Sequence, residues 1–300
     1  MIERIKALVG DSQVLINEEL NKYTTFKVGG PCKALVLIKT EDLLLKVINL
    51  LKENKEAFFV IGNGSNLLIS DKGYDGYVLK LEGDFLSIKA EGEEIIASAG
   101  AILSKVCILA KENGLSGLEF AYGIPGTVGG AIVMNAGAYD GEMSFVVSSV
   151  KMLDLDGTIK TFSNSEMEFS YRNSILKHKD YIVLCVTYKL VKKDEKEILD
   201  KMNDFLERRR SKQPLNFPSA GSTFKRPKDN FAGKLIMEAG LKGKRVGGAC
   251  VSEKHAGFIV NDEGASAKDI SDLMKIVIKE VKEKFDIELE PEVIKIGKFD

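Results

Sequence analysis

A short segment in the last third of the chain combines a hydroxyl group with two adjacent cations. Residues 216–227 read NFPSAGSTFKRP, so Ser222 lies in a turn of small residues and is followed by Lys225 and Arg226. An exposed serine beside two positive charges can bind or protonate an anionic substrate. The alternative is an ordinary Ser/Gly turn. The pattern is not G-x-S-x-G and no histidine is obviously placed as a base, which disfavours a serine hydrolase.

Three further side chains are candidates for chemistry. Arg172 follows the acidic and aromatic run 166–170, and its planar guanidinium suits two-pronged recognition of a carboxylate, with a surface salt bridge as the alternative. Glu292 follows Pro291, which must lie at a sheet edge or a bend and can aim the carboxyl group into a cleft. A solvated strand end is the alternative there. His255 can line a site, although a structural role is favoured.

Glycine is concentrated in the segment 122–141, YGIPGTVGGAIVMNAGAYDG, which contains no Lys or Arg. Because glycine loses much backbone entropy on folding, such a run indicates that another group approaches the main chain closely. Backbone N–H groups in such turns hold phosphate without a cationic side chain. The small residues at 135–138 leave room for something flat and large. The alternative is a turn that only joins two strands.

A second glycine-rich loop, at 62–66, directly follows the apolar run 58–61, which is a predicted buried strand. Its N–H donors and amides are a natural ligand set for pyrophosphate. The P-loop and the dinucleotide fingerprint are both absent, and residues 67–69 continue as a strand. Two such loops indicate one long ligand held from two sides. The candidate cofactor ligands are Gly62, Asn63, Gly64, Ser65, Asn66, Tyr122, Gly123, Ile124, Pro125, Gly126, Thr127, Gly129, Gly130 and Ala131.

Alternating helices and strands are expected to position these groups. Strands are predicted at 34–38, 58–61, 77–79, 95–99, 181–190 and 287–296. Helices are predicted at 41–54, from 102 to a stop at Asn113-Gly114, up to Lys212, at 230–239 and from 266 to 285. The Asp156-Gly157 pair predicts a β-hairpin, and Ser266 with Asp269 has the spacing of a capping box. The charged stretch 191–197 is a plausible domain boundary.

The bulk composition is that of an ordinary globular protein. The 300 residues carry a net charge of −1 at pH 7, which argues against broad binding of nucleic acid or anionic membranes. The Arg-rich stretch 207–210 is therefore interpreted as a solvated helix face. No apolar run reaches the roughly 20 residues of a membrane span, and no signal-peptide core is present. Four scattered cysteines and two histidines favour buried free thiols, no metal site and a cytoplasmic location.

Four motifs agree in order and spacing with one enzyme family. IGNGSNLL, GIPGTVGGAIVMNAGAY, SAGSTFKRP and LEPEV make the chain similar to UDP-N-acetylenolpyruvoylglucosamine reductase, a flavoenzyme of bacterial peptidoglycan synthesis. The resemblance covers nearly the whole chain. The short segment between Arg172 and Ser222 is typical of the compact subtype that lacks a substrate-capping loop. Asp140 stands where the family usually has a glycine.

The resemblance implies a mixed α/β and α+β architecture. We expect a two-subdomain FAD-binding fold of the vanillyl-alcohol-oxidase (PCMH) type, followed by a C-terminal α+β substrate-binding domain. The expected ranges are 1–82 for the first FAD-binding subdomain with an N-terminal helix, 83–192 for the second, and 193–300 for the substrate domain. The C-terminal strand is expected to return to the active site.

The resemblance also implies an activity. NADPH would reduce the enolpyruvyl ether of UDP-N-acetylglucosamine to the lactyl ether of UDP-N-acetylmuramate through non-covalent FAD, in a monomer. Ser222 would protonate the carbanion, and Arg172 and Glu292 would complete the catalytic set. The expected substrate ligands are Asn135, Lys225, Arg226 and His255. Two other hypotheses stay open: a flavin oxidase of the same broad fold, and a nucleotide-sugar binding protein without turnover.

Overall fold

A computed structural model describes residues 1–299, which divide into two compact units. Unit 1 comprises Met1–Ile16, Ala34–Gly62 and Gly76–Arg209, and unit 2 comprises Asn17–Lys33, Asn63–Asp75 and the chain from Arg210 onward. This division by contacts differs from the three sequence ranges expected above. Those ranges describe cofactor and substrate functions, and they stay a prediction.

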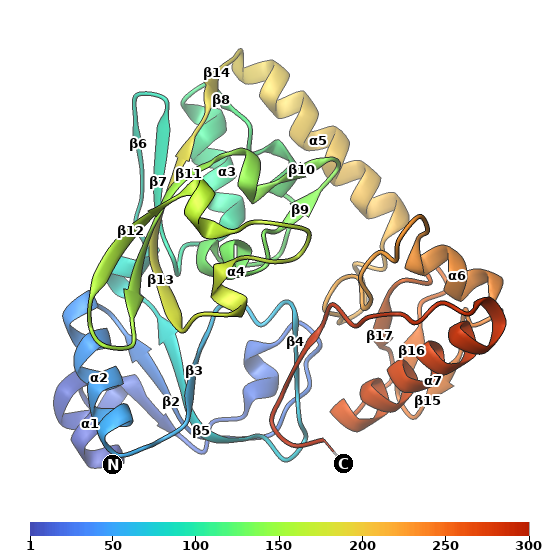
Figure 1. Cartoon of the computed structure of the whole chain (residues 1–300), viewed down its shortest axis with the longest axis horizontal. Helices are drawn as coiled ribbons and strands as arrows, with labels where there is room; N and C mark the ends of the chain where they lie inside the picture. Colours follow the sequence, from blue (N-terminus) through green and yellow to red (C-terminus); the bar gives the residue numbers. More distant parts are fainter. Residues whose placement is uncertain (300) are drawn as a thin grey trace. The chain divides into compact units, whose positions relative to one another are not determined.

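Two sheets make up most of unit 1 (Figure 1). Their strand orders are β1-β2-β5-β3 and β12-β11-β13-β7-β6. The pair β3 and β5 is parallel, whereas the second sheet is antiparallel throughout. The bounds are β1 Val14–Ile16, β2 Cys32–Ile38, β3 Phe58–Ile61, β5 Tyr74–Leu81, β6 Ile88–Glu91, β7 Glu94–Ser98, β11 Val147–Asp154, β12 Ile159–Ser163 and β13 Tyr181–Lys189.

The helices of unit 1 share one hydrophobic core with these sheets. They are α1 Ile2–Val9, α2 Glu41–Glu53, α3 Leu103–Glu112, α4 Val128–Val133 and α5 Glu195–Lys212. Helix α5 buries Ile198 and Met202 in this core, so unit 1 continues past the boundary expected at 191–197. Within residues 1–299, each helix is too short or too polar to cross a lipid bilayer.

Short strand pairs complete unit 1. They are β8 Leu115–Ser116 with β14 Val191–Lys192, and β9 Gly137–Ala138 with β10 Gly141–Glu142. The predicted hairpin at Asp156-Gly157 is confirmed, because β11 pairs with β12 across that turn. The four cysteines are free thiols, and Cys185 is the one that is not fully buried.

Unit 2 is built around helix α7 (Ala267–Phe285), whose apolar stripe is buried as its helical spacing predicts. Its other elements are α6 Ala232–Glu238, β4 Leu67–Ile69, β15 Arg245–Val246, β16 Ala249–Val251, β17 Ile259–Asn261 and β18 Ile294–Ile296. Phe26 and Leu68 are fully buried in the same core as α7. This shared core explains why two segments from early in the chain belong to unit 2.

The strand expected at 287–296 is confirmed only at its end, where β18 pairs in parallel with β4. Pro291 lacks an N–H group and cannot continue a ladder. An isolated bridge takes its place, with Phe224 opposite Pro291. The Lys225 N–H donates to the Glu290 carbonyl at 2.8 Å, and the Glu292 N–H donates to the Thr223 carbonyl at 2.9 Å.

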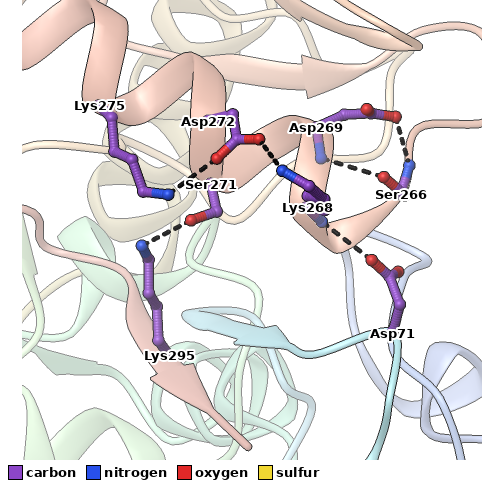
Figure 2. A network of polar contacts seen from close by, with 8 residues as sticks. All are labelled: Asp71, Ser266, Lys268, Asp269, Ser271, Asp272, Lys275 and Lys295. Atoms are coloured by element: carbon purple, nitrogen blue, oxygen red, sulfur yellow. Dashed lines mark hydrogen bonds and ion pairs between the residues drawn. The ribbon is translucent and has the colours of Figure 1, made fainter. Parts of the chain in front are cut away.

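A polar network at the start of α7 joins segment 63–75 to the helix (Figure 2). The Asp71 carboxylate accepts from the backbone N–H groups of Ala267 at 2.7 Å and Lys268 at 2.9 Å. The helix also has the expected capping box. The first N–H groups of a helix lack intrahelical partners, so a carboxylate from a distant segment satisfies them and complements the helix dipole.

Candidate active site

A pocket of about 520 Å³ lies within unit 1. Both glycine-rich segments line it, through Gly62 on one side and Thr127, Gly129 and Gly130 on the other. They are in close contact, because a Cβ added to Gly62 would lie 2.4 Å from Thr127 Oγ1. The two glycine-rich segments, which are expected to share a ligand, therefore meet at Gly62 and Thr127.

The composition of the pocket walls suits a flat, phosphate-bearing cofactor. Strand β3 and residues 181–183 of β13 provide apolar surface for an aromatic ring. The charged residues of the walls are balanced, with Lys80 and Lys179 beside Glu56 and Asp180, so backbone groups are the candidates for holding phosphate. The glycines leave backbone groups open to a large ligand. The residues present therefore fit the FAD that the resemblance implies.

Several glycines instead serve packing within the protein. A Cβ on Gly129 would lie 3.2 Å from Ala99, and one on Gly141 would lie 2.6 Å from the Phe120 ring. Gly64 has a φ of +56°, and a Cβ there would lie 2.1 Å from the Tyr23 carbonyl oxygen. The glycine richness is thus only partly explained by a ligand, which corrects the sequence interpretation.

The remaining candidate cofactor residues lie outside the pocket walls that the described residues form. They are Asn63, Gly64, Ser65, Asn66, Tyr122, Gly123, Ile124, Pro125, Gly126 and Ala131. The Asn66 amide donates to the Glu292 carbonyl at 3.1 Å. Asn66 therefore helps to hold the segment that carries Glu292.

Arg209 corrects the interpretation of 207–210 as a purely solvated face. Its side chain packs on the glycine-rich segment, since a Cβ on Gly123 would lie 3.1 Å from Arg209 Cδ. Burial lowers the pKa of its guanidinium from the usual value. The neighbouring Arg208 is exposed and pairs with Asp204 at 2.7 Å, as expected of a helix surface.

Ser222 is exposed and follows Gly221, whose φ is +74°. Its neighbour Thr223 is fully buried; its N–H donates to the Gly257 carbonyl at 2.8 Å, and its Oγ1 accepts from the Ile259 N–H at 3.0 Å. The Thr223 carbonyl accepts the N–H of Glu292. The structure therefore brings the segments of Ser222 and Glu292 together in unit 2.

The cations beside Ser222 have contacts within unit 2. Lys225 forms an ion pair with Glu290, and the Arg226 guanidinium lies 4.7 Å from the centre of the Phe231 ring. His255 Nδ1 accepts from the Gly257 N–H at 3.1 Å. Burial lowers the pKa of His255, which favours a neutral ring at pH 7. The structural role favoured for His255 agrees with these contacts.

Arg172 belongs to unit 1, in a tight turn over residues 170–173. Its Nη2 donates to the Gly137 carbonyl at 3.2 Å, within the glycine-rich segment. Asn135, expected as a substrate ligand, is fully buried, and its amide bonds to other groups of unit 1. We therefore do not retain it as a substrate ligand. Glu142 is one of those partners, and the sequence analysis missed it because it belongs to no recognised motif.

Comparison with known proteins connects this geometry to a family. An FAD binding domain model matches residues 32–163, and a model described as UDP-N-acetylenolpyruvoylglucosamine reductase, C-terminal domain, matches residues 213–296. A UDP-N-acetylenolpyruvoylglucosamine reductase from Caldanaerobacter subterraneus subsp. tengcongensis is 48% identical over 297 residues, covering 99% of this chain and 98% of that protein. The chain belongs to the UDP-N-acetylenolpyruvoylglucosamine reductase family.

Other members agree over similar lengths. The reductase from Alkaliphilus oremlandii is 49% identical over 284 residues, covering 95% of this chain and 93% of that protein. The crystal structure of the reductase from Thermus caldophilus is 38% identical, covers 93% of this chain and 98% of its own, and gives a TM-score of 0.82. The expected FAD-binding fold with a reductase C-terminal domain is therefore confirmed. The compact subtype stays a prediction.

Proposed function

We infer that this chain is an FAD-dependent UDP-N-acetylmuramate dehydrogenase of peptidoglycan precursor synthesis. It uses NADPH to reduce the enolpyruvyl ether of UDP-N-acetylglucosamine. The observation that carries this inference is the 48% identity to a reductase over 99% of the chain, with both family models matched in order. When bound, FAD supplies the hydride transfer between NADPH and the substrate.

The pocket residues are proposed to hold FAD. Gly62 and Gly130 line the pocket without a side chain, and the Thr127 hydroxyl of the second glycine-rich segment faces Gly62 of the first. Backbone donors of this kind suit a pyrophosphate. Neither glycine-rich segment contains the His or Cys that covalent flavin attachment uses, which supports non-covalent binding.

Ser222 is proposed to protonate the substrate carbon next to the carboxylate. A serine hydroxyl is a weak acid, yet the carbanion it meets is a strong base, so a well-positioned hydroxyl suffices. Its exposed place after Gly221 and the buried contacts of Thr223 support this role.

Arg172 is proposed to act on the substrate carboxylate. The reaction builds up negative charge there, and a planar guanidinium stabilises it through two parallel hydrogen bonds. Glu292 is proposed to polarise the developing enolate. Lys225 and Arg226 are proposed to bind the anionic groups of the UDP-sugar, for which Lys225 must exchange its ion pair with Glu290.

Visible absorption spectra of the purified protein test this function. We expect flavin absorbance that NADPH bleaches without oxygen, and that the enolpyruvyl UDP-sugar then restores. A protein without flavin after denaturation would contradict the proposal and favour a nucleotide-sugar binding protein. Recovery with oxygen but not with the UDP-sugar would favour an oxidase.

A further inference from the structure

The side chain of Asn135 connects two functional segments of unit 1. Asn135 has an exposed fraction of 0% and a φ of +40°. Its Nδ2 donates to the Ser170 carbonyl at 3.0 Å and to Glu142 Oε1 at 3.0 Å, and its Oδ1 accepts from the Ser144 N–H at 2.9 Å. Both N–H groups and the oxygen of the amide thus have partners. A buried amide satisfied in this way is a rigid connector.

The Ser170 carbonyl belongs to the turn that presents Arg172. Ser170 and Asn173 exchange two backbone hydrogen bonds, at 3.1 and 3.0 Å. Arg172 lies between them with a φ of +54°, a conformation that is strained for a residue with a side chain. The other end of the turn is anchored by the buried Ser174, whose Oγ donates to the Val133 carbonyl at 2.9 Å. The turn is therefore held at both ends.

The Arg172 side chain also bonds to the stretch of chain that supplies Asn135 and the Val133 carbonyl. Its Nη2 donates to the Gly137 carbonyl. Gly137 pairs with Glu142 across β9 and β10, and a Cβ on Gly137 would lie 2.9 Å from Glu142 Cβ. Asn135 and Gly137 therefore bond to the Arg172 turn, and Glu142 bonds to Asn135, from one short stretch of chain. That stretch directly follows α4, whose first residues line the pocket.

We propose that Asn135, together with Glu142, is a positioning residue that sets the place of the Arg172 guanidinium relative to the glycine-rich segment. This inference rests on the role proposed for Arg172. It gives Asn135 a function other than the substrate contact expected from the sequence. A group that stabilises charge in a transition state loses effect steeply when it is displaced, by up to about 100-fold for roughly 1 Å.

The variant Asn135→Asp tests the proposal in the FAD-loaded enzyme. Asparagine and aspartate have the same shape and both tolerate a positive φ, but the variant places a carboxylate against Glu142 and removes both N–H donors. We expect reduction of the enolpyruvyl UDP-sugar to slow by about 10- to 100-fold. Reduction of the flavin by NADPH, measured in the same preparation, should be unchanged.

The matched control is the double variant Asn135→Asp/Glu142→Gln. It reverses donor and acceptor in the bond between the two side chains and removes the contact between like charges. The Ser170 carbonyl still lacks its donor, so the lost rate should recover only in part. In an Arg172→Ala background, Asn135→Asp should have little further effect, because the group that it positions is gone.

Two outcomes separate this inference from the proposed function. Additive losses from Asn135→Asp and Arg172→Ala would overturn the positioning role, as would equal damage to both half-reactions. If Arg172→Ala alone leaves substrate reduction intact, the role of Arg172 fails instead, and the positioning role fails with it. If Asn135→Asp does not fold, Glu142→Ala, which removes the acceptor of one Asn135 N–H group, takes its place in the cycle.

Discussion

Turns with unusual backbone conformations present the proposed chemical groups. Arg172 has a positive φ itself, and Ser222 follows a glycine with a positive φ. In each case a fully buried polar neighbour holds the turn, Asn135 for the arginine and Thr223 for the serine. Strain of this kind persists only where the surroundings enforce it, which is common at functional sites.

At the residue scale, Ser222→Ala should separate the two half-reactions. NADPH should still reduce the flavin, whereas reduction of the enolpyruvyl UDP-sugar should fall by about 100- to 10,000-fold, because the proton donor is lost. Stopped-flow absorbance of the flavin measures both steps. Ser219→Ala, three residues earlier in the same motif, is the control and should change neither. Equal loss of both steps in Ser222→Ala would contradict the assignment of Ser222 as the proton donor.

Among the elements, the β9–β10 hairpin explains the departure at position 140. Tyr139 and Asp140 form its two-residue turn, with φ values of +51° and +61°. A two-residue hairpin turn with both central φ values positive prefers Asn or Gly, which accounts for the usual glycine of the family. The Tyr139 ring stacks on Phe205 of α5, with the centroids 4.6 Å apart. This contact holds the turn in place in the absence of the glycine.

The substitution Asp140→Gly should stabilise the protein. Glycine adopts a positive φ without a steric penalty, so we expect the free energy of unfolding to rise by about 0.5–1 kcal/mol. Denaturation with urea, followed by circular dichroism, measures this change. Alanine lacks both the freedom of glycine at positive φ and a polar side chain, so Asp140→Ala should lower the free energy of unfolding. A loss of stability in the glycine variant would show that the Asp140 side chain contributes a contact of its own.

The cap that Asp71 provides to α7 makes a second prediction at this scale (Figure 2). Asp71→Ala leaves two N–H groups of the helix without their acceptor, and should lower the free energy of unfolding by about 1–2 kcal/mol. Asp272→Ala removes ion pairs with Lys268 and Lys275 on the surface of the same helix, and should cost below about 1 kcal/mol. Similar losses in both variants in urea denaturation would argue against the long-range cap.

At the scale of the whole molecule, each unit is assembled from separate stretches of the chain around its own core. The pocket-lining residues lie in unit 1, and the segments of Ser222 and Glu292 lie in unit 2.

The protein is proposed to act as a monomer, as expected in the sequence analysis. Light scattering after size-exclusion chromatography should give a mass near 33.0 kDa, independent of concentration. The loaded protein should carry one FAD per chain. A stable species of twice that mass would contradict the proposal.

Much of the fold was predictable because its signals are local. The helical spacing of α2 and α7, the capping box at Ser266 and the hairpin at Asp156-Gly157 all appear in the structure as predicted. The strand near Pro291 was overestimated, since residues 290–292 form an isolated bridge in place of a continuous ladder. The proposed catalytic residues were identified by motif resemblance, and their roles stay predictions.

The sequence alone determined the family, the longer helices and most of the longer strands, because periodicity, turn chemistry and motif spacing depend on neighbouring residues. It missed helix α4 inside the glycine-rich segment and most of the short strands. Tertiary structure decided how individual residues are used. Gly129 packs on Ala99, Asn135 bonds to Ser170, and two segments from early in the chain join unit 2. These outcomes depend on groups that lie far apart in the chain and meet only when burial and hydrogen bonding compensate for the entropy of bringing them together.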